Sequence, residues 1–316
     1  LNRLPERWRR LLLPVYPWAV GRLSRTLKHL DAARPIDLVI SSHSAAIKAV
    51  RPPTGVAHLC YCHAPARYIW SLAGQYGAAS VPLRLAAPMY RVWDRRTARR
   101  VSAFLANSTH IAGEVRRCYR RPAEVVHPPV RTGFFTPDSR TPRGSHWLCA
   151  GALVPYKRFD LAIDAANRAR HALTIVGSGP ELERLRRRAG PTVSFVHDAT
   201  DAQLRDQYRR ARLLIYPQHE DFGITAPEAL ACGTPVVAYG RGGALDTVED
   251  GATGALFERQ TVDSLLEAIG RCPSNRGSVC RAQSERFAPE VFREKFLSAV
   301  RGLVRGGSGP ARAGRG

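Results

Sequence analysis

Short, almost entirely apolar segments recur along this chain, and between them lie amphipathic segments with a helical period. A strand that is apolar on both faces must be covered on both faces, which is typical of parallel sheets between layers of helices. Because the strand–helix alternation occurs twice, we expect an α/β chain with two Rossmann-like, doubly wound parallel-sheet domains. In the second set, Thr200 followed by Gln203 is a capping-box signature for a helix start. The expected strands are residues 36–41, 55–62, 101–108, 123–129, 147–153, 172–178, 192–198, 212–218 and 234–240.

A proline-rich stretch with no helical period, at roughly residues 128–145, separates the two sets of strands. We therefore expect an N-terminal domain over residues 1–135 and a C-terminal domain over residues 136–301. The Gly- and Arg-rich residues 302–316 hold too little apolar surface to form a core, so we expect a disordered tail there.

The chain carries 48 basic and 26 acidic residues, which gives a formal net charge of +22 at pH 7. Almost all of the basic residues are arginines, and a GC-rich genome alone enriches a protein in Arg, Ala, Gly and Pro. The functional explanation is affinity for an anionic surface, either phospholipid or nucleic acid. The excess charge is concentrated in residues 1–30 and 84–121, which lack the interleaved aromatic side chains of a base-stacking platform. This pattern favours an anionic membrane surface over nucleic acid.

Neither a membrane span nor a metal site is visible in the sequence. No segment contains the ~20 apolar residues that cross a bilayer, and no secretory signal opens the chain. The seven cysteines include no CxxC spacing, so we expect reduced thiols and no metal. These features predict a cytoplasmic protein, one able to lie peripherally on the inner membrane face.

The most informative segment runs from Glu220 to Glu228, after the strand expected at 212–218. Ligands of open α/β sheets bind beyond the carboxyl ends of the strands, where this segment lies. Pro227 suits the first turn of a helix, so the backbone N–H groups around Gly223 form a ready phosphate site. Carboxylates beside a phosphate need hydroxyl groups that donate hydrogen bonds to them, as sugar and ribose hydroxyls do. The alternative is a helix-capping Glu228 and a surface Glu220.

Three further candidates lie at strand ends. Lys157, one of only four lysines, follows the strand at 147–153 and can place its ammonium against a diphosphate; the alternative is a solvated lysine. Gly177 belongs to a Gly-x-Gly turn that either makes a tight strand–helix connection or packs against a nucleotide. His63 ends the strand at 55–62 and has a structural alternative as well.

Together these segments resemble the family-4 retaining glycosyltransferases, which have the GT-B architecture of two domains facing a cleft. The resemblance covers nearly the whole chain, from about residue 1 to 300. Its most specific part is the run HEDFGITAPEALACGTPVVAYGRGGALDTVEDGATGALF, which contains the E-x7-E element. The YCHAPARY segment around His63 is similar to the bacterial branch that builds O-antigen or exopolysaccharide, often with mannose donors.

The resemblance implies a role for each candidate. Glu228 would hold the ribose hydroxyls and Glu220 the donor sugar, while Lys157 would bind the diphosphate. His63 would contact the sugar from the opposite, acceptor-side domain. The other donor-binding candidates are Gly177 and the backbone amides of Phe222, Gly223, Ile224 and Thr225.

The implied function is the transfer of a hexose, with mannose favoured, from a nucleotide diphosphate sugar such as GDP-mannose. The acceptor would be a lipid-linked saccharide or a glycan, and the reaction would retain anomeric configuration without a metal or other cofactor. Two alternatives remain: a basic nucleic-acid-binding module, and a catalytically inactive GT-B remnant that only binds nucleotide sugar.

Two features depart from the family pattern. The family usually has an arginine where Ala152 follows Gly151, so we expect Lys157 to be the main side-chain cation from that loop. The family's N-terminal strand and Gly-Gly loop have no counterpart before residue 36. We therefore expect a first domain that lacks its first β–α unit, in a sequence that is a fragment of a longer chain.

Overall fold

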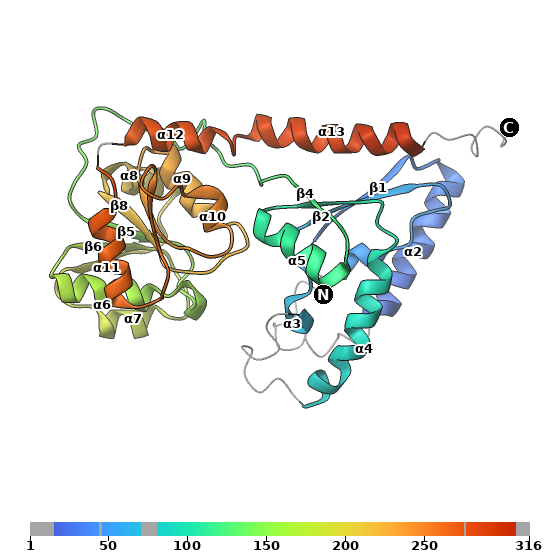
Figure 1. Cartoon of the computed structure of the whole chain (residues 1–316), viewed down its shortest axis with the longest axis horizontal. Coiled ribbons are helices and arrows are strands. Elements are labelled where there is room, and N and C mark those ends of the chain that lie inside the picture. The colour runs from blue at the N-terminus through green and yellow to red at the C-terminus, as the bar shows by residue number, and fades with distance from the viewer. Residues whose placement is uncertain (1–15, 44–45, 71–80, 275, 308–316) are drawn as a thin grey trace. The chain divides into compact units, whose positions relative to one another are not determined.

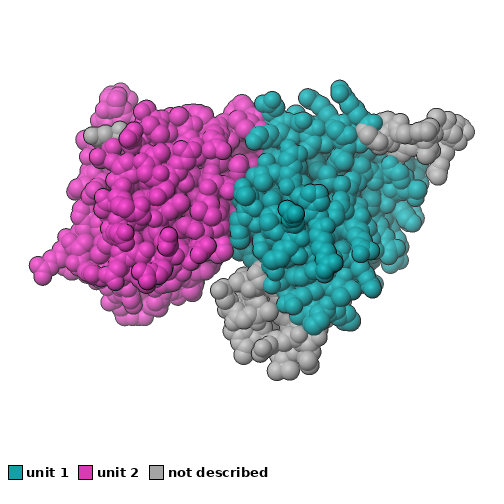
Figure 2. Space-filling model, in the orientation of Figure 1, with its two compact units in different colours: residues 1–126, 294–316 teal, residues 127–293 magenta. Residues whose placement is uncertain are grey.

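The computed structural model of the chain describes residues 16–43, 46–70, 81–274 and 276–307. It divides the chain into unit 1, which comprises residues 1–126 and 294–316, and unit 2, which comprises residues 127–293 (Figure 2). This division lies upstream of the boundary expected at 135/136, because Phe135 is buried in a core cluster of unit 2.

Unit 1 is built on a parallel sheet whose described strands follow one another in chain order, β1-β2-β3-β4. Apolar residues of β2 and β3 pack with α5 into one buried cluster, which includes Cys60, Phe104 and Val115. The elements are α2 (Tyr16–Ala33), β1 (Leu38–His43), η2 (Ile47–Ala49), β2 (Ala57–Cys62), α3 (Arg67–Trp70), α4 (Val81–Ala98), β3 (Ala103–Ala106), α5 (Thr109–Tyr119) and β4 (Glu124–Val125).

Unit 2 contains a six-stranded parallel sheet in the order β10-β9-β8-β5-β6-β7. The chain starts in the middle of this sheet and winds outward in both directions, so the order reverses between β5 and β8. This is the doubly wound arrangement expected from the sequence. The strands are β5 (Trp147–Ala150), β6 (Leu173–Val176), β7 (Val193–Val196), β8 (Leu213–Tyr216), β9 (Val236–Tyr239) and β10 (Gly254–Phe257).

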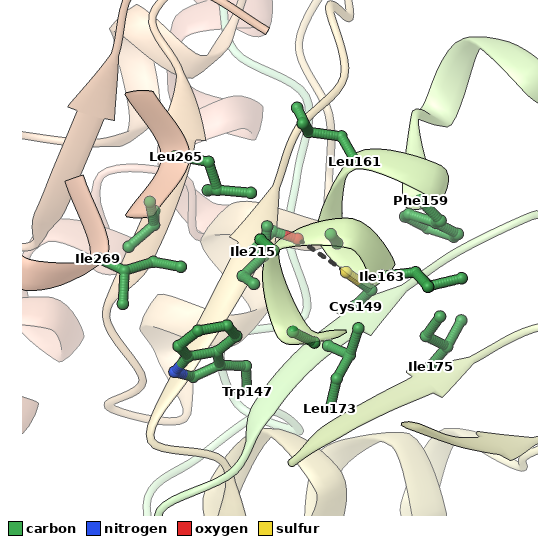
Figure 3. Close-up of a cluster of buried hydrophobic side chains, with 14 of the residues drawn as sticks. Trp147, Cys149, Phe159, Leu161, Ile163, Leu173, Ile175, Ile215, Leu265 and Ile269 are labelled. Carbon is green, nitrogen blue, oxygen red and sulfur yellow. Dashed lines mark hydrogen bonds between the residues drawn. The ribbon is translucent and has the colours of Figure 1, made fainter. Parts of the chain in front are cut away.

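Helices cover both faces of the unit 2 sheet (Figure 1). Alternate residues of one strand enter different cores: Trp147 and Cys149 face one cluster, while Leu148 and Ala150 face the other. Figure 3 shows the first cluster, in which α6 and α11 meet the sheet and the Cys149 thiol donates to the Ile215 carbonyl at 3.6 Å. The helices of unit 2 are η3 (Pro155–Lys157), α6 (Phe159–Ala169), α7 (Leu182–Arg188), α8 (Asp201–Arg210), α9 (Thr225–Ala231), α10 (Ala244–Thr247), α11 (Val262–Arg271) and α12 (Gly277–Glu285). Helix α13 (Pro289–Gly307) begins in unit 2 and belongs to unit 1 from Glu294 onward.

The structure corrects the expected tail and adds one strand. Residues 302–307 are helical, because Leu303 and Val304 continue the amphipathic pattern of α13; residues 308–316 lie outside the described part of the chain. The sequence analysis did not predict β10, whose first residue, Gly254, packs closely on its neighbour. A Cβ at Gly254 would lie 1.8 Å from the Val236 carbonyl oxygen.

The seven cysteines are buried or half-buried. All seven cysteines are free, and burial raises the pKa of the Cys118, Cys232 and Cys280 thiols to about 12. In the described part of the chain, no helix combines the length and the apolar character needed to span a membrane.

Candidate functional site

The candidate site lies where the strand order of unit 2 reverses. Strands β5 and β8 are parallel neighbours, with Trp147 paired to Leu213, so the loops that follow them leave the same edge of the sheet. Lys157 ends the loop after β5, and Glu220 lies in the loop after β8. The Lys157 ammonium forms an ion pair with a Glu220 carboxylate oxygen, and their side chains are only 9% and 17% exposed. The alternative hypothesis of a solvated Lys157 and a surface Glu220 is therefore wrong.

Tyr216, at the end of β8, fixes the Glu220 carboxylate. Its hydroxyl donates to Glu220 Oε2 at 2.6 Å, and burial raises the Tyr216 pKa well above its usual value, so the hydroxyl keeps its proton. Gly223 makes room for this bond. It has a φ of +82°, and a Cβ there would lie 1.7 Å from the Tyr216 hydroxyl oxygen. Tyr216 was not predicted as a site residue, because the expected strand ran to Gln218 and only the structure ends β8 at Tyr216.

The loop between β8 and α9 offers backbone donors. Helix α9 begins at Thr225 without a side-chain cap. Among the described residues, no backbone carbonyl accepts a hydrogen bond from the amides of Gly223, Ile224 or Thr225. These N–H groups are therefore available to an anion. Phe222, the first residue expected to offer its amide, has its side chain buried between His127 and Phe287, with ring centroids at 5.6 and 5.5 Å.

A second glycine-rich loop, after β9, supports the first. The Gly243 amide donates to the Glu220 carbonyl at 2.9 Å, and a Cβ at Gly243 would lie 2.3 Å from the Phe222 Cα. At Gly242 a Cβ would lie 2.2 Å from the same Glu220 carbonyl oxygen. Only glycine permits this packing. Both glycines lie in the run that carries the family resemblance, and no local pattern predicted their contacts.

Glu228 projects from α9 and is held by a second tyrosine. The Tyr208 hydroxyl donates to Glu228 Oε2 at 3.2 Å, so Glu228 is not a helix cap. Burial raises the pKa of the Glu228 carboxyl to about 7, against smaller opposing effects of the Tyr208 hydrogen bond and of Arg131. The carboxyl is therefore about half ionised near neutral pH. Sequence reasoning did not identify Tyr208, which lies on α8, 20 positions before Glu228.

Gly177 belongs to the packing behind Lys157. It follows β6 with a φ of +149°, and a Cβ there would lie 1.9 Å from the Gly151 carbonyl oxygen. Gly179 is similarly close to Leu153. The Gly-x-Gly turn thus lets two strand–helix loops stack, as the tight-turn interpretation expects. A contact between Gly177 and a nucleotide stays a prediction.

His63 lies in unit 1, at the carboxyl end of β2. Its Nε2 is 3.0 Å from the Ser42 hydroxyl, and its ring meets the edge of Tyr61 at 5.1 Å between centroids. It therefore shares the carboxyl edge of that sheet with the end of β1. Its contact with a sugar bound to unit 2 stays a prediction. Within the described residues, no group of three or more His, Cys, Asp or Glu side chains is placed to hold a metal ion.

Comparison with known proteins gives the family of both halves. The family model described as "Glycosyl transferases group 1" matches residues 144–287, and the model described as "Glycosyltransferase Family 4" matches residues 2–134. A D-inositol 3-phosphate glycosyltransferase from Mycolicibacterium smegmatis is 32% identical over 190 residues, which are 52% of this chain and 43% of that protein. The matched region thus spans less than half the length of that relative.

Solved structures share the fold. Sucrose-phosphate synthase from Thermosynechococcus elongatus superimposes with a TM-score of 0.75 at 20% identity, covering 96% of this chain and 81% of that one. Anabaena Alr3699/HepE, solved in complex with UDP, gives a TM-score of 0.69 at 17% identity, covering 90% and 82%. Both similarities establish the fold alone. With both family models matched and this GT-B fold, the chain belongs to the family-4 glycosyltransferases.

Proposed function

We propose that this chain transfers a hexose from a nucleotide diphosphate sugar to a glycan or lipid-linked saccharide, with retention of configuration. Mannose is the favoured sugar and GDP-mannose the favoured donor. One observation carries the proposal: a cation, a tyrosine-held carboxylate and backbone amides meet at one edge of the unit 2 sheet. Among the described residues, no backbone carbonyl accepts from these amides. The cation and the backbone amides suit a diphosphate, and the carboxylate suits sugar hydroxyls that donate hydrogen bonds.

The geometry gives each group a task in the transfer. As the sugar leaves, negative charge develops on the diphosphate, and Lys157 with the amides of Gly223 and Ile224 is preorganised to stabilise it. Glu220, held by Tyr216, accepts hydrogen bonds from the sugar hydroxyls and orients the ring. Glu228 accepts from the ribose hydroxyls. We propose that this chemistry proceeds without a metal or another cofactor.

The relatives support a nucleotide sugar as the donor. The Anabaena structure contains UDP, and the mycobacterial relative is named for an inositol phosphate acceptor. A thermal-shift panel of GDP-, UDP- and dTDP-sugars tests the donor, since a ligand that binds only the native state raises its Tm. We expect the largest shift with GDP-mannose. A flat panel would contradict nucleotide-sugar binding.

We expect Glu220 to act on the sugar during transfer and Glu228 to act on donor binding. Glu220→Gln should lower transfer at saturating donor by roughly 100-fold or more, the scale of one preorganised electrostatic group, and change donor affinity much less. Glu267→Gln, an exposed residue of α11, is the matched control and should alter neither. Equal losses in affinity and turnover for Glu220→Gln would contradict a role at the sugar.

We also propose that the protein works at the cytoplasmic face of an anionic membrane, where a lipid-linked acceptor would lie. Support comes from the net charge of +22. Lys and Arg near such a surface each contribute about 1 kcal/mol of attraction, which salt screens over ~8 Å.

A further inference from the structure

A cationic pocket lies in unit 1, between α2, α4 and the loop after η2. Its volume is about 440 Å³, within the ~300–1,000 Å³ typical of small-molecule sites. The floor is apolar and includes Val20, Ala49 and Trp93. Among the described residues, the lining includes no carboxylate and four basic side chains: Arg25, Lys28, Arg51 and Arg100.

The structure fixes the Arg51 backbone and the Arg100 guanidinium. The buried Ser24 hydroxyl donates to the Val20 carbonyl at 2.7 Å and accepts from the Arg51 amide at 3.0 Å, which ties the Arg51 backbone to α2. The Arg100 guanidinium donates to the Ala49 carbonyl at 2.9 Å. Burial, and then the like charge of Arg51, lower the Arg100 pKa below its usual value. Four like charges that line one pocket repel one another, and a bound anion would relieve this repulsion.

The pocket lies away from the edge where His63 lies. Arg51 precedes β2 and Arg100 precedes β3, so both lie toward the amino ends of the strands. His63 follows β2, at the carboxyl ends. The pocket is therefore a separate feature from the expected acceptor side of unit 1.

Two exposed apolar side chains lie on the helices that border the pocket. On α2, Trp18 is 58% exposed next to the lining residue Pro17, and the Arg22 guanidinium lies 5.2 Å from its ring centroid. On α4, Met89 is 70% exposed and lies on the same helical face as Trp93. A tryptophan beside cations is typical of the boundary between water and lipid.

We propose that this pocket binds a phosphoryl group, and that the group belongs to the headgroup of an anionic phospholipid. The inference rests on the membrane-surface part of the proposed function and is independent of donor chemistry in unit 2. It assigns the contact to a defined pocket rather than to diffuse charge.

The test compares two triple variants of the full chain with the same change in charge. The pocket variant is Arg25→Gln/Lys28→Gln/Arg51→Gln, and all three of its residues are exposed. The control is Arg99→Gln/Arg116→Gln/Lys295→Gln, which alters exposed residues outside the pocket. Sedimentation uses vesicles of equimolar phosphatidylglycerol and phosphatidylcholine, then phosphatidylcholine alone. Calorimetry with glycerol phosphate tests a soluble source, and circular dichroism checks that each variant folds.

We expect the pocket variant to lose at least about tenfold more affinity for the anionic vesicles than the control. A second outcome is that glycerol phosphate binds the wild type but not the pocket variant, while both variants lose the same affinity for the vesicles. That result would support a phosphoryl site in the pocket and overturn the phospholipid as its ligand. If both variants lose the same affinity for the vesicles and glycerol phosphate does not bind, the pocket is not a phosphoryl site. The proposal that the protein works at an anionic membrane would then still stand. No binding of the wild type to either probe would overturn both. If the pocket variant fails to fold, Arg51→Glu against Arg99→Glu repeats the comparison.

Discussion

Burial of Glu228 favours the protonated form of its carboxyl group. Hydrogen bonds from ribose hydroxyls would favour the charged form. In the unfolded chain a glutamate has a pKa of ~4.3, whereas burial raises the folded-state pKa of Glu228 to about 7. Between these values the native state binds more protons than the unfolded state. Its free energy of unfolding therefore falls as pH rises from ~4.3 through 7.

Glu228→Gln should remove this pH dependence and keep an acceptor for Tyr208. Above pH 7 we expect the variant to be more stable than the wild type by about 1–3 kcal/mol, with the difference vanishing near pH 4. Urea unfolding at pH 5 and pH 8 measures it. The same comparison for Glu267→Gln should show no such trend, and a pH-independent difference for Glu228→Gln would exclude a raised pKa.

Gly223→Ala tests how the Glu220 carboxylate is held. A side chain at a φ of +82° is strained by about 1–2 kcal/mol, and this Cβ also collides with the Tyr216 hydroxyl. Gly251→Ala is the matched control, because Gly251 has a φ of +75° and open space around it. We expect Gly223→Ala to cost more stability than the control in denaturant unfolding. Adding Tyr216→Phe should recover part of the excess; identical costs at both glycines would exclude the clash.

At the scale of elements, two loops that share one sheet edge make the candidate site. The loop after β5 contributes a single buried cation, Lys157, and exposes Ala152 to solvent. Ala152→Arg should therefore fit without a clash and add a second cation facing the diphosphate. We expect roughly tenfold tighter donor binding by calorimetry, the worth of one charge-assisted hydrogen bond. Ala152→Gln is the uncharged control, and unchanged or weaker binding of the arginine variant would contradict the assigned role of this loop.

Elements with strong local signals were predictable from the sequence. The capping box at Thr200 is present, with Gln203 N–H donating to the threonine hydroxyl at 3.3 Å and Gln203 Oε1 accepting from the Thr200 amide at 2.8 Å. The nine expected strands all form. Strand β10 was not predicted, because a segment of four residues that begins with glycine is typical of a turn. The reason for the glycine is the close approach of Gly254 to Val236 of β9, which is a tertiary contact.

At the scale of the whole molecule, sequence order gave two parallel-sheet units but not the contacts between distant segments. Glu220, Glu228 and Lys157 could be proposed as candidates from their motifs. The pairing of Lys157 with Glu220 could not, because it requires β5 and β8 to be neighbours. Tyr208 and Tyr216 were missed because a tyrosine beside a strand or on a helix is usually a core residue. Their hydroxyl contacts depend on tertiary packing that no local pattern encodes.

The most direct test of the account is calorimetric titration of GDP-mannose at pH 6.5, in two buffers that differ in ionisation enthalpy. Ribose hydroxyls that donate to Glu228 favour its charged form, so wild-type binding should release part of a proton. Glu228→Gln should bind roughly 10- to 150-fold more weakly, without proton release. Equal affinity and identical proton release in the two proteins would contradict nucleotide binding at this site.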